Sequence, residues 1–203
     1  MSNRLLACLV FLALATGTGL FAADSPVPKI AIQPLGNVKA DILAQTQKSL
    51  EQLYTVEVTI LPARDLPSIA YYRPRERYRA EKLLTWLEGN TDASYDKIIG
   101  LTESDISTTK DDVYDWGIFG LGELGRRPCV VSSFRLSRAV PRAKMLERLG
   151  KVAGHEVGHT FGLEHCPVDG CLMHDAGGKV ATVDGEPGQL CESCRKRVPA
   201  RGP

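Results

Sequence analysis

The residues best suited to chemistry form one short run late in the chain, and all four histidines lie within residues 155–174. His155, Glu156 and His159 form a His-Glu-x-x-His motif that is followed by Gly162 and His165. On a helix, residues four apart share a face, so His155 and His159 can direct two imidazole nitrogens at one ion. Gly162 can adopt a left-handed conformation, end the helix and return His165 as a third ligand. The spacing therefore predicts a zinc site with three histidine ligands.

Three protein ligands are typical of a catalytic zinc, because the fourth position stays open to water or substrate. Zinc in such a site lowers the pKa of its water and polarises a peptide carbonyl. Glu156 lies one position round the helix, where its carboxylate can take a proton from that water and later deliver it to the leaving amine. We therefore predict a zinc-dependent peptidase with Glu156 as general base and acid. Two alternatives stay open: a zinc-stabilised binding protein without catalysis, and a zinc hydrolase of non-peptide amides or esters.

Four cysteines follow the histidines as two close pairs separated by nineteen residues, Cys166 with Cys171 and Cys191 with Cys194. This pattern is typical of a structural zinc held by four thiolates, which would cross-link a tail poor in hydrophobic periodicity. It would also hold His165 through its neighbour Cys166. Two disulfides are the alternative, because paired cysteines of exported proteins usually oxidise.

The first 23 residues are typical of a secretory signal peptide. Arg4 precedes an apolar run at residues 5–14, and small residues end at Ala22 and Ala23. A short membrane anchor is the alternative, but the run is brief for a membrane-spanning helix. We expect cleavage near residues 22–23, export to the periplasm or the medium, and no stable membrane insertion of the mature chain.

The composition fits one globular domain, which we place at residues 24–200. Of 203 residues, 43% are hydrophobic and 24% are charged, and 25 lysines and arginines face 24 acidic residues. A net charge of +1 gives no electrostatic case for nucleic acid or an anionic membrane as a partner. We expect a peptide or protein substrate, no nucleic acid and a monomer.

Strands and helices alternate before the histidine run, which favours an α/β or α+β domain with a mixed sheet. Alternating or buried apolar patterns predict strands at residues 29–33, 56–61, 96–101, 116–121 and 129–136. Helical spacing of apolar residues predicts helices from Asn37 through Leu53, at Arg75–Leu87, and from Pro141 through the histidines. On the last helix Gly150, Gly154 and Gly158 recur every four residues, so we expect another segment to pack very close to its backbone.

The run from His155 to Cys194 resembles the archaemetzincin signature, His-Glu-x-x-His-x-x-Gly-x-x-His-Cys-x4-Cys-x-Met-x17-Cys-x-x-Cys, and matches it at every position, including Met173. A weaker likeness extends upstream through Arg77–Ala80, Phe119–Leu121 and Val131–Leu136. The chain therefore resembles the archaemetzincins, a family of metzincin zinc peptidases.

The resemblance implies a metzincin-like fold with a twisted mixed sheet and two long helices, one carrying the His-Glu-x-x-His motif. It divides the domain into a sheet and helix part at residues 27–163 and a small cysteine-rich zinc-bound part at residues 164–198. It also implies two Zn²⁺ ions per chain, a catalytic one on the three histidines and a structural one on the four cysteines. Met173 would form the methionine turn beneath the catalytic metal, in a packing role.

Two further assignments concern the cleft in front of the metal. In metzincins an edge strand over the cleft pairs with the substrate backbone, and Trp116–Gly120 is the candidate, since its glycines permit close approach. An ordinary packed strand is the alternative. His174 follows Met173 directly, either as a surface or packing residue or as an extra proton donor near the active site.

Overall fold

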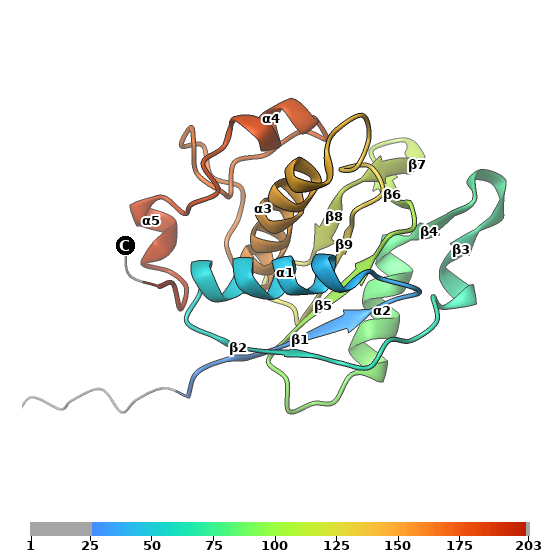
Figure 1. Ribbon diagram of the computed structural model, residues 1–203, viewed down its shortest axis with the longest axis horizontal. Coiled ribbons are helices and arrows are strands. Elements are labelled where there is room, and N and C mark those ends of the chain that lie inside the picture. The colour runs from blue at the N-terminus through green and yellow to red at the C-terminus, as the bar shows by residue number, and fades with distance from the viewer. Residues whose placement is uncertain (1–25, 202–203) are drawn as a thin grey trace, which may run out of the picture.

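The computed structural model describes residues 26–201, so the expected signal peptide lies outside the described residues. A mixed five-stranded sheet lies at the centre, with strand order β2-β1-β5-β9-β8 (Figure 1). Its strands are β1 (Lys29–Pro34), β2 (Glu57–Ile60), β5 (Lys97–Thr102), β8 (Gly120–Gly122) and β9 (Pro128–Ser132). Strands β2, β1, β5 and β9 pair in parallel, and β8 runs antiparallel to β9 at the edge. The mixed sheet predicted from the sequence is confirmed.

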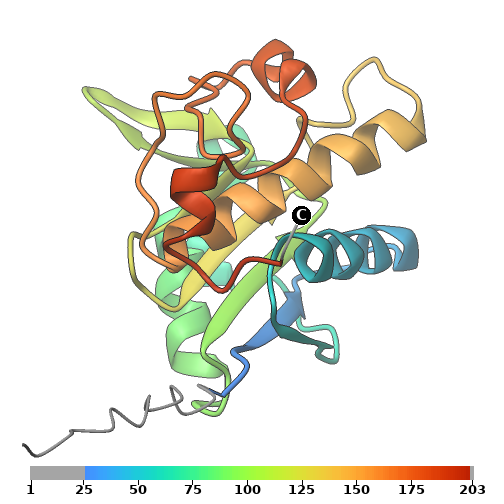
Figure 2. The same cartoon turned by 90° about the vertical axis from the view of Figure 1, so that its left-hand side faces the viewer.

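Helices cover both faces of this sheet (Figures 1 and 2). The long helices α1 (Ala40–Leu53) and α3 (Arg142–Thr160) pack on one face, and α2 (Ala80–Asn90) packs on the other. Because side chains alternate along a strand, Ile99 and Leu101 of β5 join the core beneath α1 and α3, whereas Ile98 joins the core beneath α2. Both cores therefore meet through the central strands.

A second, four-stranded sheet has the order β3-β4-β6-β7. It contains β3 (Tyr71–Tyr72), β4 (Arg77–Arg79), β6 (Ile106–Lys110) and β7 (Val113–Ile118), and short 3₁₀ turns at Ser68–Ala70 (η1) and Arg73–Arg75 (η2) surround β3. Two sequence predictions are wrong here. The helix expected at Arg75–Leu87 begins only at Ala80, and the strand expected at residues 116–121 is divided between β7 and β8, which belong to different sheets.

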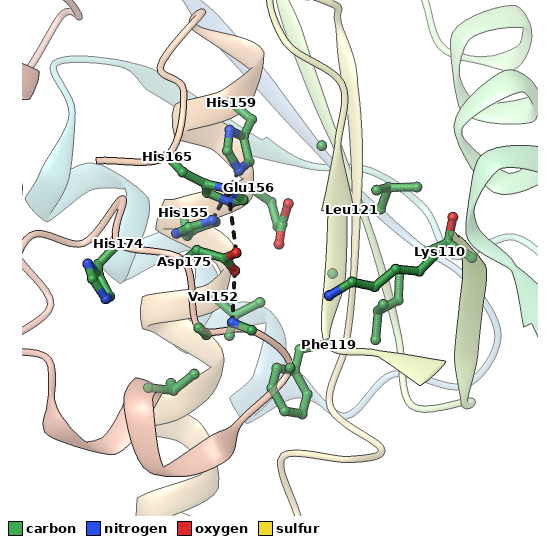
Figure 3. Close-up of a pocket in the computed structure, with 18 of the residues that line it drawn as sticks. Lys110, Phe119, Leu121, Val152, His155, Glu156, His159, His165, His174 and Asp175 are labelled. Atoms are coloured by element: carbon green, nitrogen blue, oxygen red, sulfur yellow. Dashed lines mark hydrogen bonds and ion pairs between the residues drawn. The ribbon is translucent and has the colours of Figure 1, made fainter. Parts of the chain in front are cut away.

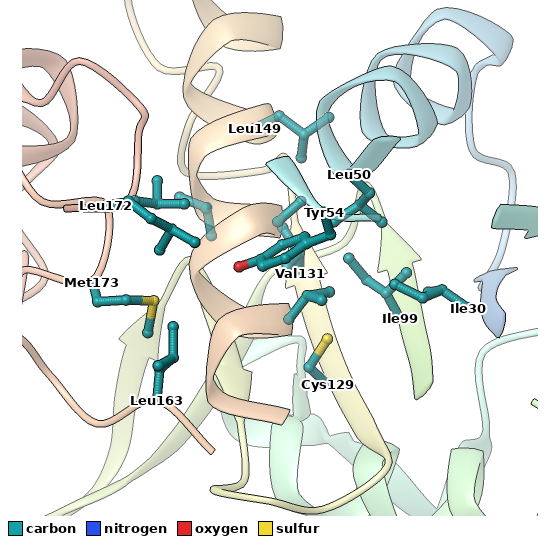
Figure 4. Close-up of a cluster of buried hydrophobic side chains, with 14 of the residues drawn as sticks. Ile30, Leu50, Tyr54, Ile99, Cys129, Val131, Leu149, Leu163, Leu172 and Met173 are labelled. Atoms are coloured by element: carbon teal, nitrogen blue, oxygen red, sulfur yellow. The ribbon is translucent and has the colours of Figure 1, made fainter. Parts of the chain in front are cut away.

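The glycine stripe of α3 lies where other segments reach its backbone, as expected from the sequence. A Cβ on Gly150 or Gly154 would collide with Ser49 or Leu53 of α1, and the Tyr54 hydroxyl donates to the Gly154 carbonyl at 2.7 Å. Tyr54 is fully buried beside α3 among apolar side chains (Figure 4). These contacts fix the helix that carries the histidines against α1.

Residues 161–201 cross the side of α3 that faces away from the sheet (Figure 2). Their helices are the short α4 (Val180–Gly185) and α5 (Glu192–Arg195). Leu172, Met173 and Leu190 of this segment join the core formed by α1, α3 and the sheet. Backbone hydrogen bonds such as Leu172 N–H to Gln189 O, 2.7 Å, hold its loops together. Among residues 26–201 no helix is long and apolar enough to cross a membrane.

Candidate active site

The end of α3 and the turn after it bring the three predicted zinc ligands together. His155 and His159 lie one turn apart, with their Nε2 atoms 3.0 Å from each other. Gly162 then adopts a left-handed conformation, with φ of 90°, and the Leu163 N–H donates to Gly158 O across the helix end. This reversal returns His165, and one nitrogen from each of the three rings lies within 4.8 Å of the others.

The surroundings of the rings suit a metal ion. The Nδ1 atoms of His155 and His159 face the carbonyl oxygens of Leu172 and Leu163, each at 2.7 Å. A carbonyl only accepts, so both Nδ1 atoms carry the hydrogen and both Nε2 lone pairs are available to a metal. Burial lowers the pKa of His155 to about 4 and lowers the pKa of His159, which keeps both rings in the neutral, metal-binding form.

The spacing of these nitrogens also fits zinc. Two nitrogens each about 2.0–2.1 Å from a tetrahedral zinc lie about 3.3 Å apart, close to the Nε2 separation seen here. The three histidines would hold the ion and leave one position open.

Glu156 is buried between α3 and β8 (Figure 3). A Cβ on Gly120 would lie 2.6 Å from Glu156 Cγ, and a Cβ on Gly122 would lie 2.5 Å from the Glu156 carbonyl oxygen. The two glycines therefore let β8 approach α3 at the catalytic motif. Burial raises the pKa of Glu156 to about 8, and the backbone N–H of Gly122 opposes this shift. A bound cation would oppose it further.

A cavity of about 630 Å³ opens in front of the histidines and Glu156. Strand β8 lines one side, and Lys110 of β6 lies on the same side (Figure 3). Trp116 of β7 also lines the cavity. The segment Trp116–Gly120, expected to form one edge strand, is divided in the structure. Trp116 belongs to β7, and the edge strand of the central sheet is β8, which begins at Gly120. Within residues 26–201, β8 pairs with β9 alone.

The four C-terminal cysteines form a second cluster, and their sulfurs lie within 4.8 Å of one another. Cys166 Sγ lies 3.8 Å from Cys191 Sγ, and Cys171 Sγ lies 3.8 Å from Cys194 Sγ. Four sulfurs about 2.3 Å from a tetrahedral zinc are about 3.8 Å apart, whereas a disulfide needs about 2.05 Å. The hydroxyl of Ser193 lowers the pKa of Cys191 to about 6, which favours a thiolate ligand. The donor set and its spacing fit zinc.

Met173 connects the two clusters. Met173 is fully buried, and its carbonyl accepts from the Cys166 N–H at 2.8 Å. Its side chain packs against Gly158, one residue before His159. His174 is half-buried and lines the same cavity as the other three histidines, but neither metal-ligand cluster found within residues 26–201 includes it.

Some residues of the cavity carried no sequence assignment. Gly122 and Glu186 both line it. The Gly-x-Gly spacing of Gly120 and Gly122 could have indicated a close backbone approach. Glu186 lies 21 residues after His165 in a segment without periodicity, so nothing in the sequence points to it.

Comparison with known proteins decides the family. The family model of peptidase family M54 matches residues 40–199. The chain belongs to peptidase family M54. The archaemetzincin of Halobacterium salinarum is 34% identical to this M54 chain over 178 residues, which cover 84% of the chain and 99% of the relative.

Solved archaemetzincins are similar to it throughout the fold. The crystal structure from Methanopyrus kandleri has a TM-score of 0.72 and 30% identity, covering 84% of this chain and 92% of the other. The structure from Archaeoglobus fulgidus, solved in complex with malonate, has a TM-score of 0.72 and 32% identity, covering 84% and 99%. The resemblance seen in the sequence and the metzincin-like fold are confirmed, and the M54 chain is a zinc metallopeptidase.

Proposed function

We propose that the chain cleaves peptide bonds at a zinc held by His155, His159 and His165, with Glu156 as general base and then general acid. The observation that carries the proposal is the convergence of three imidazoles beside a buried carboxylate on the wall of one cavity. When bound, zinc supplies Lewis acidity that polarises a substrate carbonyl and acidifies water. The remaining steps belong to side chains and backbone of the chain itself.

Glu156 takes the proton from the attacking water and delivers it to the leaving nitrogen. Its place between α3 and β8 keeps the carboxylate away from bulk water. The outer edge of β8 offers backbone donors and acceptors beside this carboxylate, and an extended substrate can pair with them as an added strand. Pairing there would align the scissile bond along the cavity.

We also propose a second zinc, on Cys166, Cys171, Cys191 and Cys194, with a structural role. The tetrahedral spacing of their sulfurs supports it. Since Cys166 follows His165, an ion bound there would restrain the third histidine of the catalytic site. Met173 would support that site by packing.

The test of the catalytic proposal is cleavage of a blocked peptide mixture by the zinc-loaded protein and by Glu156→Gln. The variant is expected to lose activity by about 10²–10⁴-fold while keeping its zinc content and melting temperature. Glu57→Gln is the matched control, because Glu57 is exposed on β2 at the opposite edge of the sheet. Equal cleavage by wild type and Glu156→Gln would refute the role of Glu156. Hydrolysis of small amides or esters without peptide cleavage would favour the alternative hypothesis of a zinc hydrolase that acts on non-peptide bonds.

Export is proposed from the N-terminal sequence alone, and the mass of the mature protein tests it together with the cysteine site. A chain beginning near residue 23 or 24 and carrying two zinc ions supports both proposals. One zinc with a loss of four hydrogens would replace the structural ion by two disulfides. An uncleaved chain would remove the export proposal and leave the peptidase proposal untouched.

A further inference from the structure

Two buried polar atoms in the cavity have no hydrogen-bond partner among the described residues. They are Oε1 of Glu186 and Nδ1 of His174, and both residues line the same cavity as the three zinc-ligand candidates. The Glu186 residue is only 9% exposed. A buried carboxylate oxygen without a partner is costly, so such groups commonly mark a place where a ligand supplies the partner.

These atoms lie in one part of the cavity, which we call the α3–α4 recess and define by five lining residues. The recess comprises Lys151, Val152, His174, Val183 and Glu186. His174 and Lys110, which both line the cavity, lie on opposite sides of Asp175 (Figure 3). Val152 and Val183 give the recess apolar walls. Its polar side chains are those of Lys151, His174 and Glu186.

The recess is held rigidly by α3 and α4. Arg148 of α3 binds Asp184 of α4 through two hydrogen bonds of 2.8 and 2.7 Å. Lys151 donates to the Val183 carbonyl at 3.1 Å, and the Glu186 N–H donates to Thr182 O at 3.2 Å. Glu186 is therefore positioned by fixed backbone, as a specificity group requires.

The charge balance of the recess favours a cation. Lys151 is its one lysine, and its ammonium is already engaged by Glu147 at 2.8 Å and by the Val183 carbonyl. Asp175 adds a second carboxylate to the cavity lining, 3.9 Å from His165 Nδ1. His174 can accept a hydrogen bond through its free ring nitrogen. An ammonium or guanidinium group would give Oε1 of Glu186 the hydrogen-bond donor that no described residue provides.

We propose that the α3–α4 recess is a substrate side-chain pocket, and that it selects a lysine or arginine residue next to the cleaved bond. The aliphatic stem of that side chain packs between Val152 and Val183, and its cationic head donates to Glu186. His174 accepts a second hydrogen bond from the same head group. The inference rests on the proposed peptidase function and adds the substrate class.

The experiment compares zinc-loaded wild type with Glu186→Gln on a blocked peptide library of even composition, with cleavage sites located by mass spectrometry. Wild type is expected to favour lysine or arginine at one position flanking the cleaved bond by about ten- to hundredfold over glutamine or norleucine. Glu186→Gln, which keeps the shape of the side chain, is expected to lose most of this preference. Glu57→Gln, at the exposed opposite edge of the sheet, should keep the wild-type preference.

A binding measurement separates selection from turnover. In a Glu156→Gln background, a lysine peptide is expected to bind at least about tenfold more tightly than its norleucine counterpart by calorimetry, and adding Glu186→Gln should abolish the difference. Glu57→Gln serves as the surface control again. Zinc content and melting temperature show whether each variant is folded.

The outcomes distinguish the two proposals. Peptide cleavage without a basic preference, or with a preference that survives Glu186→Gln, overturns the recess as a basic-residue pocket and leaves the peptidase function standing. Absence of cleavage by folded, zinc-loaded wild type overturns the peptidase function. In that case the calorimetric difference still decides whether Glu186 binds cationic side chains.

Discussion

The sulfur of Met173 lies 2.5 Å from the position that a Cβ on Gly158 would occupy. Gly158 lies in the last turn of α3, between Glu156 and His159, and Met173 comes from the segment that crosses that helix. The methionine therefore occupies space that only a glycine leaves free. This contact ties the predicted methionine turn to the backbone that carries the metal ligands.

Gly158→Ala is expected to lower the free energy of unfolding by about 1–3 kcal/mol, because the added methyl overpacks the contact with Met173. Denaturant unfolding of the purified protein measures it. Gly89→Ala is the matched control, since Gly89 also lies in a helix but nothing lies within 4 Å of its Cβ position. That control should be neutral or stabilising by up to about 1 kcal/mol. Similar losses in both variants would contradict the packing role of Met173.

Gly120→Ala is expected to reduce kcat by about 10–100-fold, because a Cβ there would meet the side chain of Glu156 and displace its carboxylate. Zinc content should stay at the wild-type level, since the three atoms nearest to this position all belong to Glu156. Steady-state kinetics and metal analysis on the same sample test both statements. Wild-type kcat in the folded variant would show that the position of Glu156 does not limit the reaction.

His159→Ala is expected to lose one zinc and all measurable hydrolysis while the ion on the cysteines remains. The physical reason is that two histidines hold zinc less firmly than three, whereas His159 is not part of the cysteine cluster. Native mass spectrometry counts the ions. Cys191→Ser is the complementary variant and should lose the other ion first. Retention of two ions in His159→Ala would refute the ligand assignment.

Asp184→Asn is expected to lower stability at pH 7 by roughly 1 kcal/mol, given the partly exposed side chain. Arg148 lowers the pKa of Asp184 from 3.8 to about 2 in the folded protein. Stabilisation by the ion pair is therefore complete above about pH 4, where the unfolded chain is also ionised, and is lost as the pH falls toward 2. Unfolding curves of both proteins should converge over that window. Asp65→Asn, an exposed carboxylate, provides the surface control.

The sequence predicted those parts of the fold whose hydrophobic pattern is contained within the element itself. The strands at β1, β2 and β5 and the helices α1 and α3 follow from apolar periodicity, and the histidine spacing follows from helix geometry. The start of α2 was misplaced because Arg79 is buried at 1% exposure by partners far along the chain, Thr109 and Tyr114. No local pattern contains those contacts.

The candidate site shows the same division. His155, His159 and His165 lie together because one helix and one glycine turn join them, so sequence spacing was sufficient. The recess around Glu186 depends on how α4 packs against α3, and α4 has only six residues and no periodicity. Tertiary contacts such as the Arg148–Asp184 pair determine that position, and a single sequence does not reveal them.

The two glycines of β8 limit how this cleft can change. Gly120 and Gly122 lie so close to α3 that a side chain at either position would collide with Glu156. At these two positions β8 can therefore present only backbone to the cleft. Mutational freedom is therefore concentrated on the opposite wall, between His174 and Glu186. In evolution or in a laboratory library, substitutions that change the substrate preference would therefore accumulate between His174 and Glu186, and Gly120 and Gly122 of β8 would stay unchanged.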